Sequence, residues 1–444
     1  MIDLQVGLGA CCTATSILLV YLWCKHRYLY VKPSVVFALL FNLLMQWPSY
    51  YYYQTIHDRL DRALPDVILI ISSFPLITLG ISACILRRDA RAVYDNLTLC
   101  SLPSYRNYQL LAVATLSCAG IYFVYVPLTA TGLFSILAGQ DAISSMVARE
   151  RSLKLLSALP RYAHTIGSVV FANMLAVLAA YRAFLAYRSR EPLRIVNTAM
   201  RSAAIIFLAA AFAAVSGARV PAAVTLLGIV VFFLLRSGLR VQTRYLTLSL
   251  ALVLLVPTIM EYLRSDSRDW SIAAAEILHR TVYVPFSAGI ENVAYAEEFG
   301  RFGIAAIEKL AVVLGIQPIN APNEVAKHIF STDLVDSAYT NCSFIFSYYA
   351  YFGILSLPLC VVLTQCLDAA TWATHRLVAP PLQCLAVTNT VLSMLALIST
   401  DYTTVFVSSG FVPWLAVCSA LGVRQRLHPR SHVRQGAETM YSHP

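Results

Sequence analysis

Long runs of apolar residues, separated by short polar connections, recur along the whole chain of 444 residues. Many runs reach about 20 residues without a charge, which is the length an α-helix needs to cross the hydrocarbon core of a membrane. Polar and apolar positions do not alternate along these runs, as they would in membrane-barrel strands. The pattern therefore predicts an all-α polytopic membrane protein with about eleven transmembrane helices. The expected spans are residues 4–24, 34–54, 66–86, 109–131, 164–186, 202–217, 220–236, 245–263, 342–366, 382–400 and 405–422.

Arginine and lysine residues gather in every second connection between these spans. Cytoplasmic loops of membrane proteins are enriched in such residues, so these connections are expected on the cytoplasmic side and the N-terminus on the other side. The residues are Lys25, Arg27 and Lys32 after the first span, Arg87, Arg88, Arg91 and Arg106 after the third, Arg188, Arg190, Arg194 and Arg201 after the fifth, Arg236, Arg240 and Arg244 after the seventh, and Arg424, Arg426, Arg430 and Arg434 after the eleventh.

The chain is expected to form one transmembrane domain over residues 1–444, with three features on its outer face and a cytoplasmic tail at 423–444. The outer features are the loop 132–163, the tip of the hairpin between the sixth and seventh spans, and the large loop 264–341. Connections as long as 264–341 are usually functional or form small subdomains. The large loop is therefore the first place to look for chemistry.

Three helices are expected inside the large loop. The first covers 269–284, is capped by Asp269, and places Glu276, Arg280 and Tyr283 on one face. The second is ENVAYAEEF, which stops at Gly300, and the third runs from Glu324 through His328.

Composition supports a membrane protein. Hydrophobic residues make up 58% of the chain and charged residues only 13%, whereas soluble domains are about half apolar and a quarter charged. The net charge of +10 at pH 7 is explained by cytoplasmic loops, so no nucleic acid is expected as a partner. The 11 cysteines show neither a CxxC pair nor a Cys/His metal spacing, so we expect small core residues rather than a disulfide framework or a zinc site.

Arg219 stands between two apolar runs with almost no loop around it. An arginine at hydrocarbon depth costs a few kcal/mol. Either Arg219 reaches the lipid headgroups, or it holds an anion at the membrane face. A guanidinium can grip two oxygens of a phosphate or diphosphate, which favours the second role.

Further basic residues on the expected outer face can serve the same anion. The substrate-binding candidates are Arg161, Arg264, Arg268 and Arg301, with Arg280 as a second catalytic arginine. Surface arginines balanced by nearby acids are the alternative, and Glu276, one helical turn before Arg280, is a ready partner for it.

A general base is expected among the outer-loop residues. His279 and His328 are the outer-loop histidines that could act as a base and are the catalytic candidates, with Tyr283 and Glu297 as substrate-binding neighbours. Glutamates 291, 297 and 298 are alternative bases. No Gly-rich phosphate loop, HExxH, GxSxG or DxD-type motif stands in the outer loops, so neither a metal nor another cofactor is expected.

Four stretches carry a family resemblance: the SGARV hairpin, HRTVYVPFSAGIENVAYAEEFG, QPINAPNEVAKHIFSTD and AYTNCSFIFSYYAYFG. In this order and topology the chain resembles the Wzy-type O-antigen polymerases, the oligosaccharide repeat-unit polymerases of bacterial envelopes. The resemblance covers about half of the chain, from the sixth span onward.

The resemblance implies a metal-independent, GT-C-like glycosyltransferase of polysaccharide and lipopolysaccharide biosynthesis, in the bacterial inner (cytoplasmic) membrane with a periplasmic active face. Its substrates would be undecaprenyl-pyrophosphate-linked oligosaccharides, and a growing glycan would move onto the newest lipid-linked repeat. Arg219 matches the family's hairpin arginine and Arg280 its loop arginine. The lipid bilayer and a polysaccharide chain-length regulator are the implied partners.

Two other functions stay open at this point. An O-antigen ligase uses the same donor lipid, and there His328 would matter more. A transporter or flippase for lipid-linked oligosaccharides would place charges or broken helices at the bilayer midplane, and few such charges stand in the spans.

Overall fold

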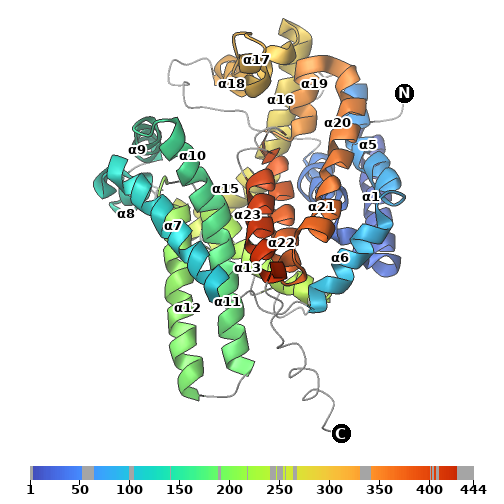
Figure 1. Ribbon diagram of the computed structural model, residues 1–444. Coiled ribbons are helices and arrows are strands. Elements are labelled where there is room, and N and C mark those ends of the chain that lie inside the picture. Colours follow the sequence, from blue (N-terminus) through green and yellow to red (C-terminus); the bar gives the residue numbers. More distant parts are fainter. Residues whose placement is uncertain are drawn as a thin grey trace.

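The structure is a computed structural model, shown in Figure 1, that is helical throughout its described part, without a β-strand. It describes residues 4–52, 65–99, 105–140, 142–188, 192–217, 219–240, 247, 254–255, 257–263, 268–330, 342–400, 402, 405–406 and 410–427.

The helices are α1 (Leu4–Lys25), η1 (Arg27–Val31), α2 (Pro33–Phe41), η2 (Asn42–Gln46), α3 (Trp47–Tyr51), α5 (Pro65–Ser82), α6 (Arg87–Leu99), α7 (Tyr105–Tyr125), η4 (Leu128–Ala130), α8 (Gly132–Leu137), α9 (Ala142–Lys154), α10 (Ala158–Ile166), η5 (Gly167–Phe171), α11 (Ala172–Arg188), α12 (Pro192–Ala213), α13 (Arg219–Arg236), α15 (Trp270–Val282), α16 (Val284–Phe299), η6 (Gly303–Ala306), α17 (Glu308–Val313), α18 (Ala321–Phe330), α19 (Phe344–Phe352), η8 (Gly353–Leu355), α20 (Ser356–Leu367), α21 (Ala369–Leu377), α22 (Pro380–Leu397) and α23 (Phe411–Leu427).

Seven helical stretches in the described part are long and apolar enough to cross a membrane, so the α-helical membrane class is confirmed. They are Leu4–Lys25, Pro65–Ser82, Tyr105–Tyr125, Ala158–Arg188, Ile195–Ala213, Phe344–Leu377 and Pro380–Leu397. Two shorter apolar helices, Pro221–Arg236 and Phe411–Gly422, stand where further spans were expected. Nine of the 19 residues of the expected span 245–263 lie outside the described residues, so the count of eleven stays a prediction.

The helix ends expected on the cytoplasmic side lie together. The helix α6 packs against η1, α21 and α22, and the hydroxyl of Tyr94 on α6 donates to the carbonyl of Gly238 beyond α13, at 2.9 Å. At the start of α7, the amide of Asn107 donates to the carbonyl of Leu421 in α23. Connections that are far apart in sequence therefore share one end of the molecule, as the charge pattern predicts.

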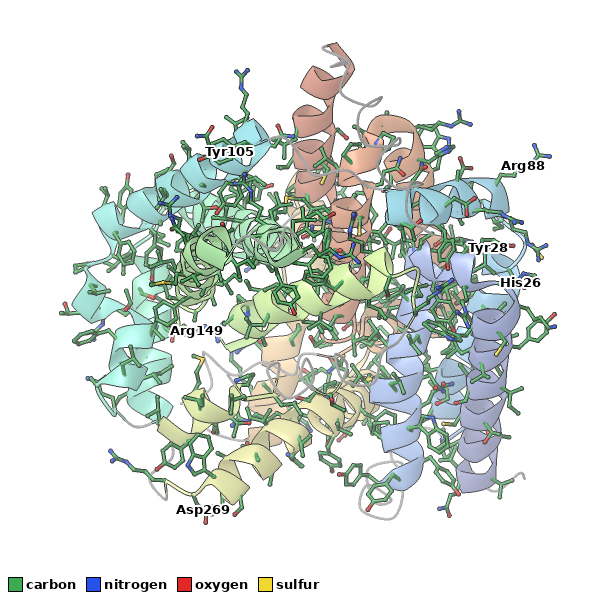
Figure 2. All side chains as sticks on the ribbon, turned by 90° about the horizontal axis from the view of Figure 1, so that it is seen from below. His26, Tyr28, Arg88, Tyr105, Arg149 and Asp269 are labelled. Atoms are coloured by element: carbon green, nitrogen blue, oxygen red, sulfur yellow. The ribbon has the colours of Figure 1, made fainter. Side chains whose placement is uncertain are left out.

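The opposite end carries the large loop. Figure 2, which is seen from below, shows Asp269, at the start of α15, well apart from Arg88 and Tyr105. In Figure 1 the helices α16, α17, α18 and α19 form the top of the view, away from the C-terminus. The side of the membrane that each end faces stays a prediction.

A buried ion pair fastens neighbouring ends of α2, α5 and α20. The ammonium of Lys32 donates to the carboxylate of Asp368 at 2.8 Å, and both side chains are at most 1% exposed. The same ammonium donates to the carbonyls of Ser82 and Ile85, and the carboxylate accepts from the backbone and the hydroxyl of Ser34. Lys32 was expected among the loop cations, but its charge is fully enclosed and satisfied, so it joins helices rather than facing the cytoplasm.

The large loop is seated on the membrane helices through α16. This helix packs along α19, where Gly289 leaves the space that the buried ring of Phe346 fills. The ring of Tyr283, between α15 and α16, meets the edge of Tyr52 at 5.2 Å. The loop is thus a packed helical layer on this end of the molecule.

Candidate functional site

The α12–α13 hairpin turns sharply at its tip, and Arg219 is the first residue of α13. The turn closes with the N–H of Gly217 donating to the carbonyl of Ala214 at 2.7 Å, with Gly217 at φ +83°, a conformation that favours glycine. Arg219 therefore begins the second helix of the hairpin, as its place between two apolar runs predicts. Its side chain lies outside the described part of the chain.

The short helix α8 packs directly on this tip. The N–H of Leu133 donates to the carbonyl of Val215 at 3.2 Å, and Gly132 lies against the backbone of Ser216 and Gly217. The apolar side chains of Ile136 and Ala222 belong to one buried cluster here. The helix α8 thus ties the loop 132–163 to the hairpin.

We expect Gly132→Ala to loosen this contact. A Cβ at Gly132 would collide with the carbonyl oxygen of Ser216, and backbone shifts forced in this way cost about 1–3 kcal/mol. The purified variant should melt at a lower temperature than the wild type. Gly120→Ala is the matched control, because nothing lies within 4 Å of a Cβ at Gly120. Equal melting of the two variants would contradict the tight contact.

Arg268 reaches the same helix from the large loop. One guanidinium nitrogen lies 3.7 Å from the position of a Cβ on Gly139, just after α8. The backbone of Arg268 is left-handed, at φ +46°, which is uncommon for a residue with a side chain. Arg268 and the hairpin of Arg219 therefore both adjoin the short α8 segment. Arg264 lies outside the described residues.

The next residue, Asp269, caps α15 as expected. Its carboxylate accepts from the N–H groups of Ser271, at 2.7 Å, and Ile272, at 3.4 Å. Hydrogen bonds from the hydroxyl and N–H of Ser271 hold the pKa of Asp269 below its usual range. The ring of Trp270 stacks on Tyr262 at 4.4 Å. These contacts fix the start of α15 beside Arg268.

Arg280 is paired with its helical neighbour. Its Nε lies 2.5 Å from the carboxylate of Glu276, and the two side chains are 53% and 39% exposed. The local partner considered from the sequence is therefore present. Such an exposed pair contributes only about 0.3–0.5 kcal/mol, so Glu276 holds Arg280 only weakly.

His279 lies exposed beside Arg280 on α15. Its ring stacks on Tyr283 at 4.7 Å, with an interplanar angle of 25°. Tyr283 in turn meets Tyr52. The structure thus brings two of the predicted residues, His279 and Tyr283, into direct contact.

Arg301 and Glu297 form a separate polar cluster between α16 and α19. The two residues pair at 3.4 Å, and the hydroxyl of Tyr349 donates to the same Glu297 oxygen at 2.9 Å. The guanidinium lies on Gly353, whose φ is +67°. Glu297 is thus already held by two partners, which argues against it as a free base.

His328 and Arg161 also have local contacts of their own. The exposed ring of His328 meets Phe299 at 4.6 Å and Tyr295 at 5.5 Å, so the two candidate histidines stand in different aromatic clusters. Arg161 donates to the carbonyl of Leu153 at 2.9 Å and to that of Leu156 at 3.2 Å. It therefore caps the end of α9, where carbonyls lack helical partners.

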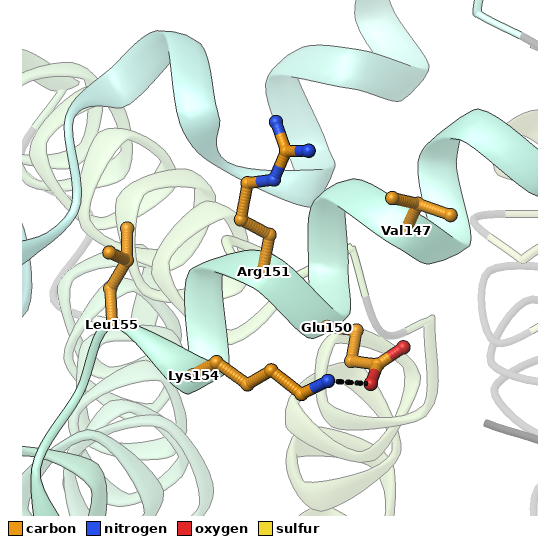
Figure 3. Close-up of a pocket in the computed structure, with 5 residues that line it drawn as sticks. All are labelled: Val147, Glu150, Arg151, Lys154 and Leu155. Carbon is orange, nitrogen blue, oxygen red and sulfur yellow. Dashed lines mark ion pairs between the residues drawn. The ribbon is translucent and has the colours of Figure 1, made fainter. Parts of the chain in front are cut away.

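A cavity of about 300 Å³ beside α9 had not been expected (Figure 3). It is lined by Val147, Glu150, Arg151, Lys154 and Leu155. The outer cations Arg151 and Lys154 were visible in the sequence. The sequence signal for Arg151 is its position four residues after Val147 and four residues before Leu155, which places the three side chains on one face of a helix.

Within the described ranges, no three His, Cys, Asp or Glu residues are grouped so that they could hold a metal ion. No family model, curated protein or solved structure matches the chain. The functional interpretation therefore rests on the residues and their placement.

Proposed function

We propose that the chain is a polysaccharide polymerase that transfers a growing glycan from undecaprenyl pyrophosphate onto a new lipid-linked repeat unit at the periplasmic face of the bacterial inner membrane. The observation that carries this proposal is the meeting of two arginine-bearing segments at α8. The hairpin of Arg219 contacts α8 through Gly132, and Arg268 lies over Gly139 at the end of that helix. The family resemblance of the sequence points to the same reaction.

Glycosyl transfer from a diphosphate depends more on cations that stabilise the leaving group than on a general acid that protonates it. The bond between the sugar and the diphosphate oxygen breaks, its electron pair stays on the diphosphate, and the acceptor hydroxyl oxygen forms the new bond. Guanidinium groups already in place around the leaving diphosphate stabilise the charge that develops there. In the proposal Arg219 and Arg268 hold the diphosphate. Arg280, paired with Glu276 further along α15, is a further candidate cation.

The acceptor hydroxyl loses its proton as the bond forms. His279 is the base we favour, because it lies next to Arg280 on α15 and its ring is exposed and oriented by Tyr283. A neutral imidazole accepts a proton well near neutral pH. Glu297 and His328 lie in their own clusters, so we assign them to sugar binding at most.

The test is transfer by the purified full-length protein in proteoliposomes that contain synthetic undecaprenyl-pyrophosphate-linked repeats. We expect a ladder of glycan lengths on undecaprenyl pyrophosphate, made equally well in the presence of EDTA. A ladder that is lost with EDTA and restored by a divalent cation would contradict the metal-independent mechanism.

Two other outcomes would replace the proposal. Product that forms only when lipid A–core is added would identify a ligase. Movement of a fluorescent lipid-linked repeat across the bilayer, without any transfer, would identify a flippase.

A further inference from the structure

One face of α9 carries a stripe of alternating apolar and basic character. Val147, Arg151 and Leu155 follow one another at intervals of four residues, so they line one side of the helix and its end. Val147 is 46% exposed and Leu155 is 48% exposed. All three line the cavity of about 300 Å³. An exposed guanidinium thus stands between two apolar side chains that are about half exposed.

Among the described residues, the charges around this stripe leave Arg151 without a carboxylate partner. Lys154 pairs with Glu150 at 2.6 Å, and Figure 3 shows Arg151 extending away from that pair. Arg161 is engaged with the carbonyls at the end of the same helix. The free cation of the cavity is therefore Arg151.

An apolar–basic–apolar stripe fits a lipid that carries a phosphate headgroup. Apolar side chains on an interfacial helix enter the acyl boundary, while a basic side chain stays at headgroup level. A guanidinium binds a phosphate through two parallel hydrogen bonds. The pair of Lys154 and Glu150, at the same cavity, offers a second cation that can turn to a second phosphate group.

The stripe lies close to the proposed active site. The helix α9 packs against α8, and α8 contacts the hairpin tip through Gly132 and Leu133. The helix α9 is therefore linked to the hairpin through α8.

We propose that the α9 stripe binds the diphosphate of the second lipid-linked substrate, the acceptor repeat, while the hairpin binds that of the donor. This inference rests on the proposed function, because a polymerase joins two lipid-linked molecules. The donor diphosphate must leave, whereas the acceptor diphosphate must stay attached to its sugar. At the α9 stripe, Arg151 and a lysine that is paired with a glutamate provide less positive charge than the donor site. The acceptor diphosphate is therefore bound there without being activated as a leaving group.

The kinetic test separates the two substrates. Wild type, Arg151→Ala and Arg151→Lys are assayed in nanodiscs with a preformed polymer on undecaprenyl pyrophosphate as donor and a fluorescent single repeat as acceptor. We expect Arg151→Ala to raise the acceptor KM by about tenfold or more, the loss expected for one charge-assisted hydrogen-bonded contact, while kcat and the donor KM stay near wild type. Arg151→Lys should fall between the two. Arg201→Ala, which removes an exposed arginine of α12, is the control and should change nothing. An unchanged acceptor KM in Arg151→Ala would overturn the inference.

A binding experiment is independent of turnover. Native mass spectrometry with undecaprenyl pyrophosphate should show two bound molecules on the wild type and one on Arg151→Ala. Two molecules bound to Arg151→Ala would overturn the inference, because the stripe would then not be a binding site. Displacement of the Arg151-dependent molecule by phosphatidylglycerol as readily as by undecaprenyl pyrophosphate would also overturn it, because the stripe would then be an ordinary lipid contact. A wild type that binds two molecules but makes no polymer would contradict the proposed function and would leave the second diphosphate site standing.

Discussion

Replacing Arg219 with Ala is expected to abolish polymer formation while the protein still inserts into the membrane. Arg219 begins α13 at the hairpin tip, where the proposal places the leaving diphosphate. Removing one preorganised donor from a developing anion lowers kcat by about 10²–10³-fold, and a full charge is lost in addition. Glycan ladders on gels measure the polymer, and immunoblots of washed membranes measure the inserted protein.

Arg219→Lys distinguishes a guanidinium from a mere positive charge. We expect it to be strongly impaired, since an ammonium cannot reproduce the two parallel hydrogen bonds of a guanidinium to phosphate oxygens. Arg201→Ala, on the same hairpin and exposed, is the control and should retain full polymer. Full polymer from Arg219→Ala or Arg219→Lys would refute the role assigned to Arg219.

Replacing Lys32 with Met is expected to have the largest effect on folding. The change leaves the carboxylate of Asp368 buried without its cation, since both side chains are at most 1% exposed. Removing one partner of a buried ion pair costs about 3–5 kcal/mol. It also strips the carbonyls of Ser82 and Ile85 of their donor. We expect a markedly lower melting temperature in detergent and little accumulation in membranes.

The double variant Lys32→Met/Asp368→Leu tests the physical reason. With both charges gone no buried ion remains, so the double variant should be more stable than either single variant. Lys154→Met is the exposed control, because its lysine side chain is 74% exposed and such pairs are worth about 1 kcal/mol or less. A Lys32→Met protein as stable as Lys154→Met would show that the pair does not hold the helices together.

Much of the fold could be predicted because its signals are local. Apolar runs indicated the membrane helices, and the Asp269 cap and the stop at Gly300 were confirmed at the ends of α15 and α16. Helix starts were less accurate, since α16 begins at Val284 rather than at Glu291. The preceding helix α15 ends at Val282, just before Pro285, and Pro285 fits the first turn of α16. The short helix α17 was not expected at all.

Contacts between distant residues could not be predicted from the same signals. Lys32 and Asp368 are 336 positions apart in a chain of 444 residues, and nothing near either residue identifies its partner. The contact of Gly132 with Ser216 could not be predicted either, since a glycine near a helix start does not indicate which backbone it packs against. Only the packing of the helices brings these groups together.

In the candidate site, too, only the local pairs could be predicted from the sequence. The pairing of Arg280 with Glu276 follows from their spacing, and so does that of Arg301 with Glu297. Which arginines surround one anion depends on tertiary structure. Arg268 beside α8 was thus one of several equal candidates in the sequence, and Arg151 was not singled out.

In the proposed mechanism, guanidinium groups at the hairpin end of the molecule hold a polyprenyl diphosphate. A structure of the full-length protein in nanodiscs with undecaprenyl pyrophosphate would show whether they do. We expect diphosphate density at the α12–α13 tip, with phosphate oxygens at about 2.7–2.9 Å from the guanidinium nitrogens of Arg219 and of at least one further arginine. Diphosphate bound elsewhere, with Arg219 turned to the lipid headgroups, would contradict it.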